Sequence, residues 1–87
     1  MHAVVVRVSI TEEEAALAAL RDQVVPQVSQ APGFVAGYWT RKEGGGLSMI
    51  VFESEDAAQA ASERIPGTVP EGVTLESVEV REVVANA

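Results

Sequence analysis

The positions of apolar residues predict four strands and two helices. Valines stand at positions 4, 5, 6 and 8, and β-branched side chains pack well on a pleated surface. We therefore expect a first strand over residues 2–10. Runs rich in β-branched and aromatic residues predict further strands over residues 34–42, 47–53 and 74–84.

Between the first two strands, apolar residues recur every three or four positions, which predicts an amphipathic helix. The apolar stripe consists of Leu17, Leu20, Val24 and Val28. Thr11 and Glu14 have the spacing of a capping box, so we expect Thr11 to cap this helix. Pro26 lacks an N–H and disfavours the helical conformation of the residue before it. A kink or break is therefore expected there.

A second helix is expected over residues 55–65. Ser54 can cap its start, because a serine oxygen accepts a hydrogen bond from a free N–H of the first turn. Pro66-Gly67 ends it, and the segment 43–46, Glu-Gly-Gly-Gly, predicts a hairpin turn. The resulting order is βαββαβ. It indicates an α+β, ferredoxin-like fold, with an antiparallel sheet and both helices on one face.

Small residues dominate the apolar side of the second helix, namely Ala57, Ala58, Ala60 and Ala61. We expect them to let the helix lie close on the sheet. The alternative is a pocket between the helices and the sheet, walled by Val6, Phe52 and the first helix and rimmed by residues 66–73.

Both faces of the sheet are apolar. Strict alternation places Phe34, Ala36 and Tyr38 on one side of their strand and Val35, Gly37 and Trp39 on the other. In the next strand, Leu47, Met49 and Val51 oppose Ile50 and Phe52. Two helices cover only one face, so we expect a second copy of the chain to cover the other and form a homodimer.

The length and composition of the chain also favour stabilisation by a partner subunit. The 87 residues form one domain, residues 1–87. A chain of this size buries only about 60% of its unfolded surface and is marginal as a monomer. It has no cysteine and a single histidine, so neither disulfides nor a metal site is expected.

Charge argues against two classes of partner. The formal net charge is −7, and the six basic residues are scattered, so neither nucleic acid nor an anionic membrane is an expected partner. No apolar stretch is long enough for a membrane span or a signal-peptide core. The expected location is therefore cytoplasmic.

The chain resembles the dimeric α+β-barrel superfamily, and within it the antibiotic-biosynthesis-monooxygenase-like proteins. The resemblance rests on the element order, on the turn Pro32-Gly33-Phe34 and on residues 50–57, Ile-Val-Phe-Glu-Ser-Glu-Asp-Ala. It implies a homodimer whose two sheets close into a barrel. It also implies a ligand cleft between the helices and the sheet of each subunit.

The family's functional residues are not present at the matching positions of this chain. Relatives that degrade haem or oxidise quinols often use an asparagine in the first strand and a tryptophan at the end of the third. The matching positions hold Val6 and Phe52. The histidine that haem-degrading relatives use in the second helix has no counterpart, so neither haem nor another cofactor is expected.

Aromatic side chains are the main candidates for ligand contact, because they combine a large apolar area with a polar tip. The candidates are Phe34, Tyr38, Trp39 and Phe52, together with Val6. For Tyr38 and Trp39 the alternative is structural, one in the helix–sheet core and the other at the dimer interface. That alternative is preferred because large aromatics dominate cores and interfaces.

Two weaker candidates are polar. Histidine is a common general base near neutral pH, so His2 is a candidate for that role; the alternative is an exposed residue near the terminus. Arg7 interrupts the valine run. It serves either to bind an anionic substrate or to pair across the subunits with a glutamate such as Glu79.

Two functions follow from these observations. One is a homodimer that binds an apolar or aromatic metabolite, with cofactor-independent monooxygenase activity as its catalytic form. In that chemistry the protein binds and deprotonates a substrate that itself activates oxygen. The other is a non-catalytic structural or interaction module of the same fold.

Overall fold

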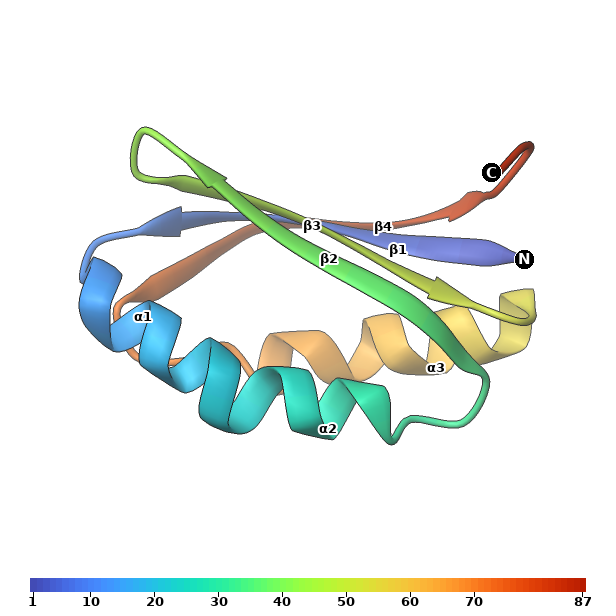
Figure 1. Cartoon of the computed structure of the whole chain (residues 1–87), viewed down its shortest axis with the longest axis horizontal. Helices are drawn as coiled ribbons and strands as arrows, with labels where there is room; N and C mark the ends of the chain where they lie inside the picture. The colour runs from blue at the N-terminus through green and yellow to red at the C-terminus, as the bar shows by residue number, and fades with distance from the viewer.

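The computed structural model describes residues 1–87 as one sheet with a layer of helices on one face (Figure 1). The strands are β1 (His2–Ile10), β2 (Phe34–Lys42), β3 (Gly45–Phe52) and β4 (Val73–Glu82). The helical segments are α1 (Glu13–Ala19), the π-helical η1 (Leu20–Val24), α2 (Val25–Ser29), α3 (Glu55–Arg64) and the 3₁₀ turn η2 (Ile65–Gly67). No helix is both long and apolar enough to cross a membrane.

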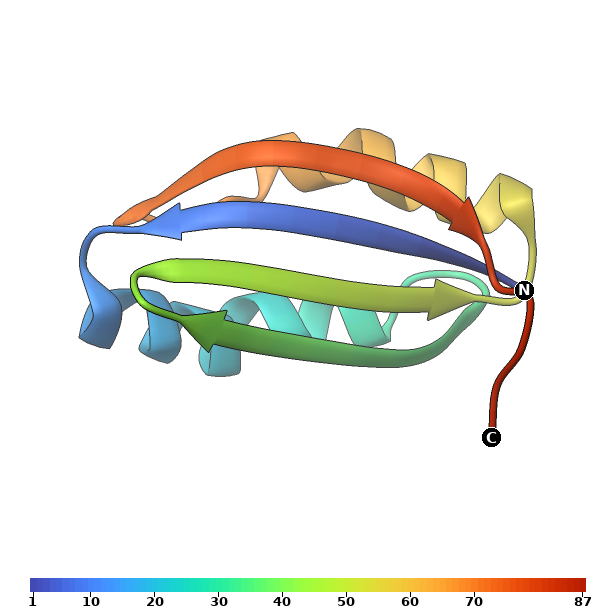
Figure 2. The ribbon, with the colours of Figure 1, turned by 90° about the horizontal axis from the view of Figure 1, so that it is seen from above.

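The sheet has the strand order β2-β3-β1-β4, and every neighbouring pair is antiparallel (Figure 2). The predicted α+β class and the βαββαβ order are therefore confirmed, and the arrangement is compatible with the predicted ferredoxin-like fold. β1 lies between β3 and β4, so the valine-rich segment forms the interior of the sheet.

The first helix is continuous from Glu13 to Ser29, and Pro26 does not break it. The chain instead widens into the π-helical segment η1 immediately before α2. Proline lacks an N–H, and its ring collides with the carbonyl four residues earlier in a regular helix. A π-helical turn removes that conflict locally, so a wider turn takes the place of the predicted kink or break.

Thr11 does not cap this helix, and the predicted capping box is wrong. Glu12 occupies the N-cap position and makes no side-chain capping bond. The Thr11 hydroxyl donates to the Gly72 carbonyl at 3.1 Å, and the Thr11 N–H donates to the same oxygen at 2.8 Å. A contact with the start of β4, 61 residues away in the chain, therefore uses the hydroxyl that the capping box required.

The hairpin between β2 and β3 has two loop residues rather than the predicted four. Glu43 and Gly44 have φ angles of +50° and +78°, and a two-residue type I′ turn requires positive φ at both positions. Gly45 and Gly46 consequently belong to β3. At the other end of the chain, β4 stops at Glu82, two residues before the predicted end.

An irregularity in β2 corrects the predicted faces of that strand. The pairing with β3 shifts between Phe34 and Ala36, so Phe34 lies on the helix-covered face with Trp39 and not on the face of Tyr38. The rings of Phe34 and Phe52 meet edge to face with centroids 6.2 Å apart. The predicted division of β3 is confirmed, since Ile50 and Phe52 are buried while Leu47 and Met49 are exposed.

The core lies between the sheet and α3. Its buried members are Val4, Val6, Ile50, Phe52 and Ala58. A side chain at Gly33 would lie 2.8 Å from the Ala57 Cβ, which shows how closely the Gly33 backbone and α3 approach each other. Ala58 is fully buried in the core, and Ala57 and Ala61 pack against it, so the expectation that alanines let this helix lie close on the sheet is correct.

Replacing Ser54 tests whether its side chain stabilises the start of α3. Ser54 Oγ accepts from the Ala57 N–H at 3.1 Å. Ser54→Ala should therefore lower the free energy of unfolding by about 1 kcal/mol, whereas Ser54→Asp should keep most of the stabilisation that the cap provides. Denaturant unfolding measures both values. Ser62→Ala is the control, because the Ser62 hydroxyl bonds only to Gln59 O within α3. Equal losses at both sites would contradict the assignment.

Candidate functional site

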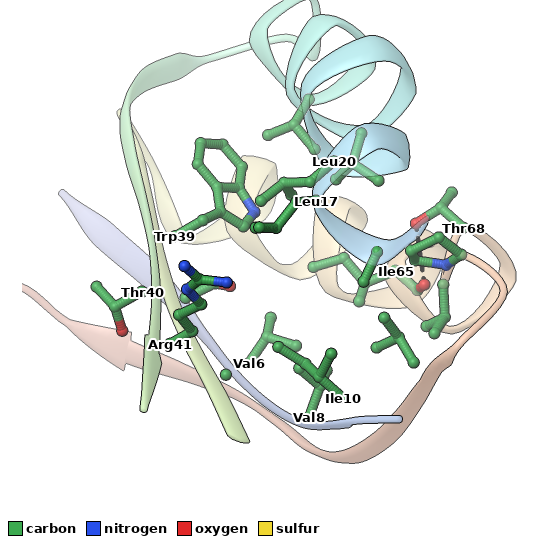
Figure 3. A pocket seen from close by; sticks show the side chains of 18 of the residues that line it. Val6, Val8, Ile10, Leu17, Leu20, Trp39, Thr40, Arg41, Ile65 and Thr68 are labelled. Atoms are coloured by element: carbon green, nitrogen blue, oxygen red, sulfur yellow. Dashed lines mark hydrogen bonds between the residues drawn. The ribbon is translucent and has the colours of Figure 1, made fainter. Parts of the chain in front are cut away.

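A cavity of about 270 Å³ separates part of the sheet from the helix 13–29. It is lined by 19 residues, of which 13 are hydrophobic. Figure 3 shows its walls, formed by strands, the first helix and the segment that follows α3. The close packing of α3 therefore does not extend over the whole sheet.

The floor of the cavity is the second half of β1. Val6, Val8 and Ile10 alternate along the strand, so all three face the helices. Gly46 of β3 lies opposite Val8 in the pairing. A Cβ at Gly46 would lie 2.7 Å from Val8 Cγ2, so glycine at this position leaves room for the valine.

The roof is the apolar stripe predicted for the first helix. Leu17, Leu20, Val24 and Val28 all line the cavity and are only half-buried. Of the helix 13–29, α2 makes the principal strand contacts, and these are with β2. Two roof residues, Leu20 and Val24, belong to the π-helical segment η1, a kind of irregularity that is frequent at functional sites.

One side wall carries an aromatic and a hydroxyl side chain. Trp39 of β2 pairs directly with Ser48 of β3, so the two side chains are neighbours on the helix-facing side. Trp39 points into the space between the sheet and the helix (Figure 3). Ser48 is 9% exposed and is the only buried polar residue of the chain, yet its hydroxyl makes no hydrogen bond within the protein.

An ion pair lies at the edge of the cavity. Arg41, two residues after Trp39, lines the cavity, and its Nη1 donates to Glu13 Oε1 at 2.7 Å. The two side chains are 51% and 57% exposed, and exposed pairs contribute only about 0–1 kcal/mol. This contact joins the end of β2 to the start of α1 and adds little to the stability of the fold.

The structure separates the predicted aromatic candidates. Trp39 and Val6 line the cavity. Phe34 and Phe52 pack against each other in the core outside it. Tyr38 is 66% exposed and lies on the open face of the sheet, opposite Met49.

The two polar candidates lie away from the cavity. His2 is at the other end of β1, where its Nε2 is 3.7 Å from Glu55 Oε2 and its Nδ1 is buried without a partner. Arg7 is exposed on the open face and forms no ion pair within the chain. Glu79, the suggested partner of Arg7 in a second subunit, here accepts two bonds from Arg81.

The two interpretations offered for the second helix each hold in part: α3 packs closely on the sheet, and a cavity lies beside it, beneath the first helix. The cavity is walled by Val6 and the first helix and bordered by residues of the 66–73 segment, as the pocket interpretation requires. Two details differ, because neither Phe52 nor the α3 alanines line it. The opening arises where the first helix stands off the sheet.

Ser48 and Arg41 were not recognised as site residues from the sequence. A serine and an arginine within strands look like ordinary polar positions. The signal that could have identified them is the register of the hairpin, which sets Ser48 opposite Trp39 and Gly46 opposite Arg41. That register depends on the two-residue turn at Glu43-Gly44, whereas the glycine run predicts a turn of four residues.

The chemistry available in the cavity is binding rather than proton transfer. Arg41 is the only titratable side chain among the lining residues, and an arginine does not lose its proton at ordinary pH. No group of three or more His, Cys, Asp or Glu side chains is arranged to hold a metal ion.

Comparison with protein-family models gave no match for this chain, and comparison with curated protein sequences gave none either.

Replacing the Ser48 hydroxyl tests the polarity of the cavity wall. Because that hydroxyl has no partner in the chain, Ser48→Val should leave the free energy of unfolding unchanged or raise it by up to about 1 kcal/mol. Thr40→Val is the matched control, since the Thr40 hydroxyl donates to Leu47 O at 2.7 Å. This control should be neutral or destabilising by up to about 1 kcal/mol. A loss of more than 1 kcal/mol for Ser48→Val alone would show that the hydroxyl is bonded.

Proposed function

We propose that this protein binds a small, flat, mostly apolar molecule in the cavity between the helix 13–29 and the sheet. The observation that carries the proposal is an apolar cavity of about 270 Å³ with Trp39 in its wall. Ligand sites are typically concave, mostly apolar and supplied with a few polar groups. The half-buried state of the roof residues and Trp39 gives a ligand access from solvent.

The size of the cavity limits the ligand. An apolar cavity of about 150 Å³ holds one benzene ring, so a two-ring aromatic body suits the space here. Burying about 200 Å² of apolar ligand surface contributes about 5 kcal/mol before the costs of association. Because about 5 kcal/mol corresponds to about 0.2 mM, the expected dissociation constant for such a ligand lies between about 0.2 mM and several millimolar.

The same proposal includes a homodimer formed through the open face of the sheet, as the resemblance to the dimeric α+β-barrel superfamily implies. Tyr38, Leu47 and Met49 are 66%, 40% and 46% exposed and lie together on that face. Arg7 and Glu79 carry opposite charges beside this patch, so a twofold arrangement can pair each with the other's copy. Two sheets stacked in this way would form the barrel.

Catalysis has less support than binding. The oxygenase chemistry implied by the resemblance needs a base to deprotonate the substrate, and the cavity lining supplies only Arg41 as a titratable group. The non-catalytic alternative, an interaction module, has its support in the exposed apolar side chains of the open face.

Ligand binding is testable with a neutral two-ring probe. 2-Naphthamide should quench the fluorescence of Trp39, the only tryptophan, in a saturable way that calorimetry confirms. Val24→Phe and Val69→Phe each place a larger side chain in the lining and should weaken binding at least fivefold. Gln27→Phe, on the exposed surface of α2, should not. If the probe does not bind, or if the filling variants bind as the natural chain does, the binding proposal fails.

The dimer is testable by sedimentation equilibrium. We expect two chains per particle at micromolar concentration, with an interface of about 2,000 Å² in total. Met49→Lys buries an unpaired charge in that interface and should shift the equilibrium to monomer by at least a hundredfold. Gln27→Lys adds the same charge on the helical side and should have no effect. A folded natural chain that sediments as a monomer would rule out the dimer.

A further inference from the structure

We propose that the ligand of this cavity carries one anionic acceptor group, a carboxylate or its equivalent, which Arg41 binds at the cavity edge. The inference rests on the proposed binding function and specifies the chemistry of its ligand. Ser48 and Trp39 supply further hydrogen-bond donors beside Arg41. The apolar body of the ligand then lies beneath the roof of the first helix.

The polar side chains of the cavity that remain free are donors. The Trp39 indole nitrogen can only donate, the Arg41 guanidinium can only donate, and the Ser48 hydroxyl can do both. The two other hydroxyls of the lining are already used, since Thr40 donates to Leu47 O and Thr68 donates to Ile65 O. No carboxylate lines the cavity. Its free polar groups therefore complement an acceptor.

These donors occupy one side of the cavity. Ser48 lies opposite Trp39, and Arg41 is the next helix-facing residue along β2. Figure 3 shows Trp39 and Arg41 on the β2 wall, with the apolar side chains of Val6, Val8 and Ile10 on the adjoining floor. A ligand with one polar end and one apolar end fits this division, whereas a ligand with polar groups at both ends does not.

Arg41 is held in place by one hydrogen bond, and its remaining donors stay free. Only its Nη1 bonds to Glu13, and its Nε and Nη2 make no hydrogen bond within the chain. A planar guanidinium with two free nitrogens can bind a carboxylate through parallel bonds. The Glu13 carboxylate competes for the same charge, so a ligand anion must share Arg41 with it or displace it.

This competition gives two variants opposite effects. Removing Arg41 should weaken the binding of an anionic ligand, and removing the Glu13 charge should strengthen it. A neutral ligand of the same shape should respond to neither. Nonspecific apolar binding on the open face of the sheet would not produce this pattern, because neither residue lies there.

The experiment compares 2-naphthoate with 2-naphthamide, which share a ring system and differ in charge. Calorimetry on the natural chain should give about tenfold tighter binding of the naphthoate. Arg41→Gln should reduce this ratio to about one and change the naphthamide affinity by less than twofold. Glu13→Gln should raise the naphthoate affinity about threefold. Arg81→Gln is the control, because it removes an equally exposed ion pair on β4, and it should change neither affinity.

The possible outcomes distinguish a failure of the binding function from a failure of the anionic-ligand inference alone. If naphthamide binds and naphthoate binds no better, or if both Arg41→Gln and Glu13→Gln leave the ratio unchanged, the anionic ligand is excluded and the binding function stands. If neither compound binds to the natural chain, both the binding function and this inference are wrong.

Discussion

Burial of β1 under the helices is the interaction on which the rest of this structure depends. β1 pairs with β3 on one side and β4 on the other. Val4 and Val6 lie under the helices at 0% and 6% exposure, and together with Phe52 they form a core over one half of the sheet. Only nine of the 87 residues are buried. This small core leaves the cavity unfilled and the open face of the sheet uncovered.

The two helices pack differently on the sheet, and this difference creates the cavity. α3 presents alanines and approaches closely, whereas the first helix presents leucines and valines over a space that they do not fill. Side chains that face this space lack packing partners on one side and forfeit part of their dispersion contacts, which a bound ligand would restore.

Features set by neighbouring residues could be predicted from the sequence, and features set by distant contacts could not. The strands, the Ser54 cap and the division of β3 follow from local pattern. The role of Thr11 depends on Gly72, far along the chain. The face of Phe34 depends on a pairing irregularity with β3. The cavity depends on the spacing of two layers, so the sequence offered it only as one of two interpretations.

The central claim is that an accessible apolar cavity exists beside Trp39, and a crystal structure under xenon pressure tests it most directly. Xenon enters apolar cavities without needing polar partners. A xenon atom should occupy the space between Trp39, Leu17 and Val8, in the natural chain and in Arg41→Gln alike. A crystal without xenon there, in which Leu17 and Leu20 pack directly on Val8, would show that the core is filled and contradict the claim.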